Sequence, residues 1–155
     1  MRPTIEKAII CNEEAIKIRP NYAEAYNNLG NSLKELGDND RALVSYKKAL
    51  EINPNYSDVY NNMGALYQKS KNYEKAINSY QESLKKNPDN FQTYNNLGSI
   101  FHEIKRYKEA VMYYEKSILA KQDNVDANYK LGIIFQELGD FKKAIVSYSE
   151  ALKFD

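Results

Sequence analysis

Few residues of this chain could do chemistry. His102 is the single histidine and Cys11 the single cysteine, so no His/Cys cluster of the kind that holds zinc can form. A Cys–His pair can make an activated nucleophile, but only where the fold brings the two side chains together. Carboxylates are more plentiful, as at Glu13, Glu103 and Glu109, and they fall on the solvated faces of the expected helices. Whether any of these residues can meet depends on the elements that carry them.

A repeat of 34 residues organises these elements. The period is carried by glycines and alanines, at Gly30, Gly64, Gly98 and Gly132 and at Ala8, Ala42, Ala76, Ala110 and Ala144. Such a period indicates helix pairs that contact only their neighbours, and Cys11 and His102 lie nearly three repeats apart. All six glycines fall at two positions of the repeat, so none belongs to a phosphate-binding loop. We therefore expect no catalytic residue, no metal site, no cofactor and no enzyme activity.

The period predicts one partial and four further repeats. The boundaries are 1–22 (a closing helix and linker only), 23–56, 57–90, 91–124 and 125–155, the last of them truncated. The opening helices read AEAYNNLGNSLKEL, SDVYNNMGALYQKS, FQTYNNLGSIFHEI and VDANYKLGIIFQEL. With the recurring alanine, tyrosine and proline of the closing helices, these motifs resemble the tetratricopeptide repeat family. The YNNLG openings are most similar to the repeat arm of the O-linked N-acetylglucosamine transferases. The resemblance implies an all-α, right-handed superhelical solenoid of antiparallel helix pairs.

The glycines also predict how the helices of a pair pack. A glycine in the middle of a helix costs about 1 kcal/mol relative to alanine, so its repetition indicates a contact too close for a β-carbon. We expect the repeated alanines of the closing helices to supply the matching small surface, and the repeated tyrosines to fill the larger gaps. Gly37 and Gly139 are expected to end opening helices in the left-handed conformation. The expected N-caps are Asn21, Asn55, Asp89 and Asp123.

Composition excludes several classes of partner. Charges are dense but balanced, with a net charge of +1, which argues against a dedicated nucleic-acid or anionic-membrane binder. The sequence has no apolar run long enough to span a bilayer and no signal-peptide pattern. Cys11 alone can form no internal disulfide, which fits a reducing compartment. We expect a cytoplasmic or nuclear protein.

The two ends of the sequence suggest a larger assembly. Residues 4–19 match only the closing helix of a repeat, and the sequence stops at Asp155 as the fourth closing helix finishes. We expect a fragment of a larger protein, for which the substrate-binding arm of an O-linked N-acetylglucosamine transferase-like enzyme is one candidate. The alternative is a structural scaffold that self-associates through uncapped solenoid ends, since the last closing helix would leave its apolar face bare. That face includes Ala144, Ile145, Tyr148 and Leu152.

The expected function is to bind a protein or peptide partner. The family resemblance implies that the opening helices line a concave groove, where Asn28, Asn62 and Asn96 share one repeat position. A carboxamide both donates and accepts, so such a ladder can pair with the N–H and C=O groups of an extended peptide. The predicted peptide-binding residues are Asn27, Asn28, Asn31, Asn61, Asn62, Asn95, Asn96 and Lys130.

The charge of the same face narrows the choice of partner. Its charged positions are Lys34, Lys69, Lys130, Glu24, Glu35, Asp58, Glu103, Asp126 and Glu137. Three lysines against six carboxylates give a net charge of −3, which favours a neutral or basic segment. The co-chaperone members of the family clamp an acidic tail with cations, but Asn27, Asn95 and Ser99 stand at those positions here. We therefore do not expect an acidic partner.

Overall fold

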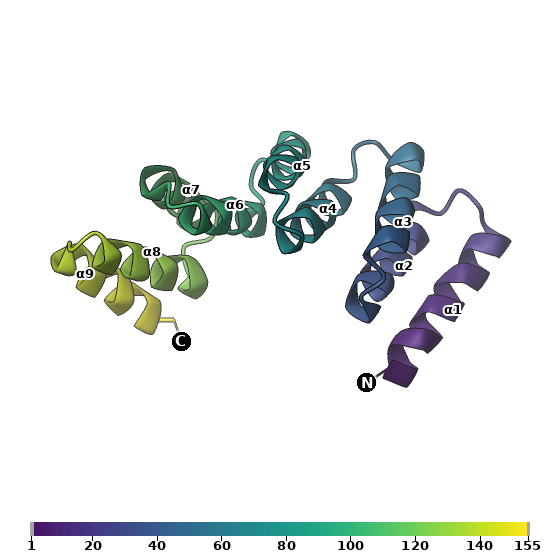
Figure 1. Cartoon of the computed structure of the whole chain (residues 1–155), viewed down its shortest axis with the longest axis horizontal. Helices are drawn as coiled ribbons and strands as arrows, with labels where there is room; N and C mark the ends of the chain where they lie inside the picture. The colour runs from purple at the N-terminus through teal and green to yellow at the C-terminus, as the bar shows by residue number, and fades with distance from the viewer. Residues whose placement is uncertain (1, 155) are drawn as a thin grey trace. The chain divides into compact units, whose positions relative to one another are not determined.

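The computed structural model describes residues 2–154, and within them the chain is an array of α-helices (Figure 1). The helices are α1 (Arg2–Ile18), α2 (Ala23–Leu36), α3 (Asn39–Ile52), α4 (Ser57–Lys69), α5 (Tyr73–Lys86), α6 (Phe91–Glu103), α7 (Tyr107–Ala120), α8 (Val125–Glu137) and α9 (Phe141–Leu152). The four opening helices begin at the first residues of the four predicted repeats. Met1 and Asp155, the outer bounds of the predicted terminal repeats, lie outside the described residues. The predicted all-α array of antiparallel helix pairs is confirmed.

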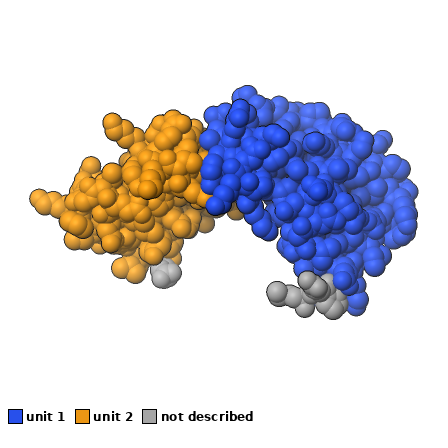
Figure 2. Space-filling view, viewed as in Figure 1, with its two compact units in different colours: residues 1–86 blue, residues 87–155 orange. Residues whose placement is uncertain are grey.

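The helices form two compact units, which Figure 2 colours separately. Unit 1 covers residues 1–86 and unit 2 covers residues 87–155. In unit 1, α2 pairs with α3 and α4 with α5, while α1 packs on α2 and α3 on α4. In unit 2, α6 pairs with α7 and α8 with α9, and α8 packs on both α6 and α7. Each unit is described by itself below.

The repeated glycines face the rings of the repeated tyrosines. A β-carbon built on Gly64 would lie 2.5 Å from Cε1 of Tyr80, and one built on Gly30 would lie 2.5 Å from Cε1 of Tyr46. Gly98 and Gly132 face Tyr114 and Tyr148 in the same way. The predicted close approach is therefore confirmed, but the atoms that crowd each glycine belong to a tyrosine ring, whereas we expected an alanine. The aromatic ring explains why only hydrogen fits at the glycine.

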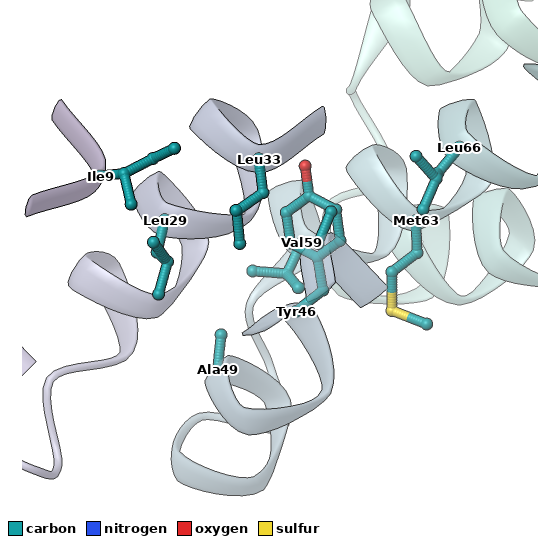
Figure 3. Close-up of a cluster of buried hydrophobic side chains, with 9 residues drawn as sticks. Ile9, Leu29, Leu33, Tyr46, Ala49, Val59, Met63 and Leu66 are labelled. Atoms are coloured by element: carbon teal, nitrogen blue, oxygen red, sulfur yellow. The ribbon is translucent and has the colours of Figure 1, made fainter. Parts of the chain in front are cut away.

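Buried side chains of several helices join the core of unit 1. Ile9 of α1 meets Leu29 and Leu33 of α2, and the cluster continues through α3 to Met63 of α4 (Figure 3). Tyr46 of α3 lies inside this cluster with no exposed surface. Apolar burial on this scale is the dominant favourable term in folding, so each helix pair depends on its neighbour for stability.

Two lysines occupy the turn position that glycine fills elsewhere. Gly37 and Gly139 have φ of 96° and 76°, as predicted for left-handed helix ends. Lys71 and Lys105 stand at the same position of the second and third repeats, with φ of 58° and 61°. A side chain with a β-carbon is strained in this region, whereas glycine is not.

Replacing either lysine by glycine should therefore stabilise the chain. We expect Lys71→Gly and Lys105→Gly each to raise the free energy of unfolding by about 0.5–1 kcal/mol, as measured by thermal unfolding. Lys71→Ala is the matched control, because alanine removes the long side chain but keeps the β-carbon. An equal gain from Lys71→Ala and Lys71→Gly would show that the backbone conformation is not the cause.

The predicted N-caps of the opening helices are wrong by one residue. The structure places the caps at Tyr22, Tyr56, Asn90 and Asn124. Asn90 accepts a hydrogen bond from the backbone N–H of Thr93 at 3.0 Å, and Asn124 does the same for Ala127 at 3.1 Å. Tyr22 and Tyr56 make no side-chain cap bond. The first two opening helices thus have an aromatic N-cap residue, and the last two have an asparagine.

Three buried tyrosines should make the fold sensitive to alkali. Burial raises the pKa of Tyr46, Tyr80 and Tyr114, so the folded chain holds them neutral while the unfolded chain ionises them near pH 10. Their contribution to stability is complete below that pH and is lost as the pH rises above it. After a jump to high pH, the slow part of the phenolate absorbance should appear at the rate at which helix content is lost. Immediate ionisation of all tyrosines with the helices intact would contradict this expectation.

Candidate functional site

The predicted binding residues of unit 1 are joined by a bond between two asparagines. Nδ2 of Asn62 on α4 donates to Oδ1 of Asn27 on α2 at 3.0 Å. Asn27 is almost fully buried and is also hydrogen-bonded to the hydroxyl of Tyr56. One carboxamide has two N–H donors and an acceptor oxygen, so the bond to Asn27 uses one donor of Asn62. Asn27 therefore holds Asn62 in place and has little surface of its own.

Asn28 and Asn31 differ in how the structure uses them. Asn28 is exposed on α2, directly beside the buried Asn27. Asn31 is half-buried, and its Oδ1 accepts a hydrogen bond from the hydroxyl of Tyr46 at 2.7 Å. Asn61, on α4, is also half-buried. The most accessible carboxamide among these unit 1 residues is thus that of Asn28.

In unit 2 the predicted Asn95 belongs to a polar network between α6 and α8. Nδ2 of Asn95 lies 3.4 Å from Oδ1 of Asn124 and 3.3 Å from Oδ2 of Asp126. Asn124 returns a bond to Oδ1 of Asn95 at 3.3 Å and donates a second to Oγ of Ser117 at 2.7 Å. This network ties the third repeat to the fourth. The predicted Asn96 and Lys130 are both half-buried, on α6 and α8 respectively.

A further bond between opening helices joins His102 and Glu137, and it was not predicted from the sequence. Nε2 of His102 on α6 lies 3.0 Å from Oε2 of Glu137 on α8. The His102 bond is the main reason that the pKa of Glu137 is lowered, and Glu137 also bonds the hydroxyl of Tyr107. The sequence separation of His102 and Glu137 is 35 residues, the same as that of Asn27 and Asn62. A search of the sequence for polar residues 35 positions apart, one repeat plus one residue, could have indicated both pairs.

The opening helices are rich in side chains that form hydrogen bonds. Among residues 2–154, no group of three or more histidine, cysteine or acidic side chains gathers where it could hold a metal ion. No helix in the described part of the chain is long and apolar enough to cross a membrane. The opening helices present carboxamides, carboxylates and lysines, which can donate to and accept from a polypeptide backbone.

Family models match nearly the whole chain. A model described as TPR repeat matches residues 4–37 and 30–71, and one described as Tetratricopeptide repeat matches residues 56–123 and 89–155. The chain belongs to the tetratricopeptide repeat family. The predicted resemblance is confirmed, and the fold is a tetratricopeptide-type solenoid. Repeats of this family are interaction modules, so the chain is a module for protein–protein interaction.

Solved structures share the fold at low sequence identity. The crystal structure of MamA has a TM-score of 0.86 and 22% identity, with 99% of this chain and 90% of that chain covered. Pseudomonas aeruginosa pilF has a TM-score of 0.90 and 22% identity, with 99% and 70% covered. YrrB, described as a tetratricopeptide protein with an unusual peptide-binding site, has a TM-score of 0.78 and 22% identity, with 93% and 74% covered. These likenesses show the fold.

One curated relative is a glycosyltransferase. The probable UDP-N-acetylglucosamine–peptide N-acetylglucosaminyltransferase SEC of Arabidopsis thaliana is 51% identical over 37 residues. The match covers 24% of this chain and 4% of the length of that protein. The aligned region is therefore about as long as one 34-residue repeat.

Proposed function

We propose that the opening helices bind an extended peptide segment of a partner protein through their side-chain amides. In unit 1 the proposed contact residues are Asn28, Asn61 and Asn62, and in unit 2 they are Asn96 and Lys130. The observation that supports this most directly is the pair of neighbouring carboxamides on α2 and α4. Asn28 is exposed, and Asn62 is held by its bond to Asn27. A side chain that is already fixed loses less conformational entropy when it binds.

The spacing of the opening helices suits an extended backbone. Packed helices lie about 8–10 Å apart, and within each unit we expect the two opening helices to lie about 10 Å apart on their inner side. An extended strand advances about 3.3 Å per residue, so one carboxamide can meet every third residue of the peptide. Bonds to backbone groups give affinity with little dependence on peptide sequence. The proposed site therefore selects for an extended peptide conformation more than for a particular peptide sequence.

Charge sets the class of peptide. In unit 1 the face has Glu24, Glu35 and Asp58 against two lysines, and in unit 2 it has three carboxylates against Lys130. In each unit this face thus has an excess of negative charge, which favours neutral or basic segments and disfavours acidic ones.

A panel of labelled twelve-residue peptides tests this proposal. The peptides share one uncharged, unstructured frame and differ by three added lysines, three added glutamates or no added charge. We expect the chain to bind the neutral and basic peptides more tightly than the acidic one, with added salt weakening only the basic complex. Tightest binding of the acidic peptide would contradict the proposed face.

The glycosyltransferase match extends the proposal to a parent protein. A peptide-binding repeat array would serve as the substrate-binding arm of an O-linked N-acetylglucosamine transferase-like enzyme, and the 37-residue match supports that role. Sequencing the transcript on both sides of the region that encodes residues 1–155 tests it. A catalytic glycosyltransferase region in the same reading frame would support this parent protein, and an unrelated one would contradict it.

The exposed apolar side chains of α9 favour self-association as a second candidate function. Ile145 is 66% exposed and Leu152 is 73% exposed, whereas Ala144, which we expected on the same bare face, is buried. Phe141 is exposed on the same helix. Light scattering over a range of concentrations should show association that an Ile145→Glu variant reduces. A monomeric chain at high micromolar concentration would exclude a scaffold of this kind.

A further inference from the structure

A hollow between α8 and α9 is lined by apolar side chains. Its volume is about 420 Å³, and its walls are Val125 and Tyr129 of α8 with Tyr148, Ala151 and Leu152 of α9. The rings of Tyr129 and Tyr148 lie 5.7 Å apart. Tyr129 is 51% exposed and Leu152 is 73% exposed. An aromatic and aliphatic hollow of this kind can take up an apolar side chain.

One repeat earlier in unit 2, the equivalent surface is covered by a helix. Tyr114 and Ser117, which stand 34 residues before Tyr148 and Ala151, are almost completely buried. The cover is the first turn of α8, whose N-cap Asn124 donates to Oγ of Ser117 at 2.7 Å and exchanges bonds with Asn95. In this repeat the serine of the closing helix is therefore covered by a polar residue, the N-cap asparagine of the next opening helix.

Unit 1 covers the equivalent surface in a different way. Here Ala49 takes the place of Ser117 and is fully buried. The helix that packs on it, α4, begins with the N-cap residue Tyr56, which packs against the core cluster that contains Ala49. The hydroxyl of Tyr56 bonds to Asn27. In this repeat the alanine of the closing helix is therefore covered by an aromatic residue, the N-cap tyrosine of the next opening helix.

The sequence repeats both combinations. Alanine is followed seven residues later by tyrosine at Ala15–Tyr22 and Ala49–Tyr56, and serine is followed by asparagine at Ser83–Asn90 and Ser117–Asn124. The physical reason is that a serine hydroxyl gives the asparagine amide an acceptor. A methyl group gives none, and an amide buried against it would lose a hydrogen bond. Ala151 belongs to the alanine class.

We propose that the hollow between α8 and α9 binds an amphipathic helix of the opening type whose N-cap residue is aromatic. The aromatic ring would lie on Ala151, and the aliphatic residue three positions later, as Val59 is to Tyr56, would enter the hollow. Tyr129 stands where Asn27 stands in unit 1, so a ring contact replaces the bond to the cap hydroxyl. Phenylalanine would therefore serve as well as tyrosine. This site binds a helix on α8 and α9 of unit 2, and it does not depend on the proposed contact amides of Asn28, Asn62 and Asn96.

Two labelled peptides test the proposal on the intact chain. One has the sequence of residues 53–69, and the other differs from it only by Tyr56→Asn. We expect the wild-type chain to bind the tyrosine peptide about tenfold more tightly, because the ring gains apolar contact beside Ala151 and covers exposed surface of Tyr129 and Leu152. The Ala151→Ser variant should reverse or abolish this preference, and serine already fits the same position at Ser83 and Ser117. Equal binding of both peptides by both chains would overturn the proposal.

A second measurement decides the matter if free peptides bind too weakly, since short isolated helices are marginal in water. The sequence of residues 54–69 is joined after residue 155, with tyrosine or asparagine at the cap. The tyrosine extension should raise the unfolding temperature more in the wild type, and the asparagine extension more in Ala151→Ser. Equal unfolding temperatures in each background would overturn the proposal. The proposal would also be overturned if the chain self-associates, if Tyr129→Ala abolishes the self-association, and if neither peptide competes with it. In that case a second copy of the chain would cover the hollow.

Discussion

Gly64→Leu should destabilise the chain by about 3 kcal/mol or more, and even Gly64→Ala should be destabilising by about 1 kcal/mol. At an open helical position, alanine would instead stabilise by about 1 kcal/mol relative to glycine. The sign is reversed because the new β-carbon would lie 2.5 Å from the ring of Tyr80. Tyr80 has no exposed surface, and its hydroxyl donates to Oε1 of Gln68 at 3.0 Å. The ring can move only by disturbing the core or by giving up that bond.

Two controls separate the ring contact from a general effect of the substitution. In a Tyr80→Leu background the ring is absent, so Gly64→Ala should cost less than it does in the wild type. Gly132→Ala also meets the ring of Tyr148, but that ring is only half-buried and can move toward solvent. Thermal and denaturant unfolding should therefore show a smaller loss for Gly132→Ala. A stabilising Gly64→Ala would refute the tyrosine contact as the reason for the glycine.

The helices and their turns could be predicted from the sequence because the repeat states each signal several times. Four glycines at one position indicated a close contact, and Gly37 and Gly139 indicated left-handed turns. The atoms that crowd the glycines could not be predicted, since a tyrosine and an alanine of the closing helix both recur at the same period. The ring orientation that decides between them depends on the crossing of the two helices.

The N-caps show a second limit of the sequence. In the third and fourth repeats two capping residues stand side by side, at Asp89–Asn90 and Asp123–Asn124, and only the backbone conformation selects one. In the first two repeats the cap is Tyr22 or Tyr56, which no capping preference favours. Tyr56 is explained only by the closing helix before it, because Tyr56 packs against the apolar cluster in which Ala49 is buried.

The hydrogen bonds among the candidate site residues could not be predicted from the sequence. The sequence placed Asn27, Asn62, His102 and Glu137 on the opening helices, and the structure pairs Asn27 with Asn62 and His102 with Glu137. Such pairs form between neighbouring repeats, so they depend on stacking and on side-chain rotamers that a periodic sequence leaves open. Part of the amide surface expected for a ligand is thus used within the fold.

Removing the three proposed contact amides should weaken peptide binding about a hundredfold. Each lost hydrogen bond costs around 1 kcal/mol net, and three of them correspond to roughly two orders of magnitude in Kd. The variant is Asn28→Ala, Asn62→Ala and Asn96→Ala together. Because Asn62 also bonds Asn27, part of any loss could come from a weakened fold. Asn27→Ala is the matched control, since it breaks the same bond but keeps the three contact amides.

The most direct test of the amide-lined face is the Kd of four chains for one neutral, unstructured twelve-residue peptide. The chains are the wild type, the triple alanine variant, Asn27→Ala, and a variant with alanine at the exposed closing-helix residues Lys47, Gln81 and Lys116. We expect about a hundredfold weaker binding for the triple variant. Asn27→Ala, which frees the side chain of Asn62, should weaken binding only about two- to tenfold, and the closing-helix variant should bind like the wild type. Loss of binding in the Lys47, Gln81 and Lys116 variant, with the triple variant unchanged, would place the site on the closing helices and contradict the account.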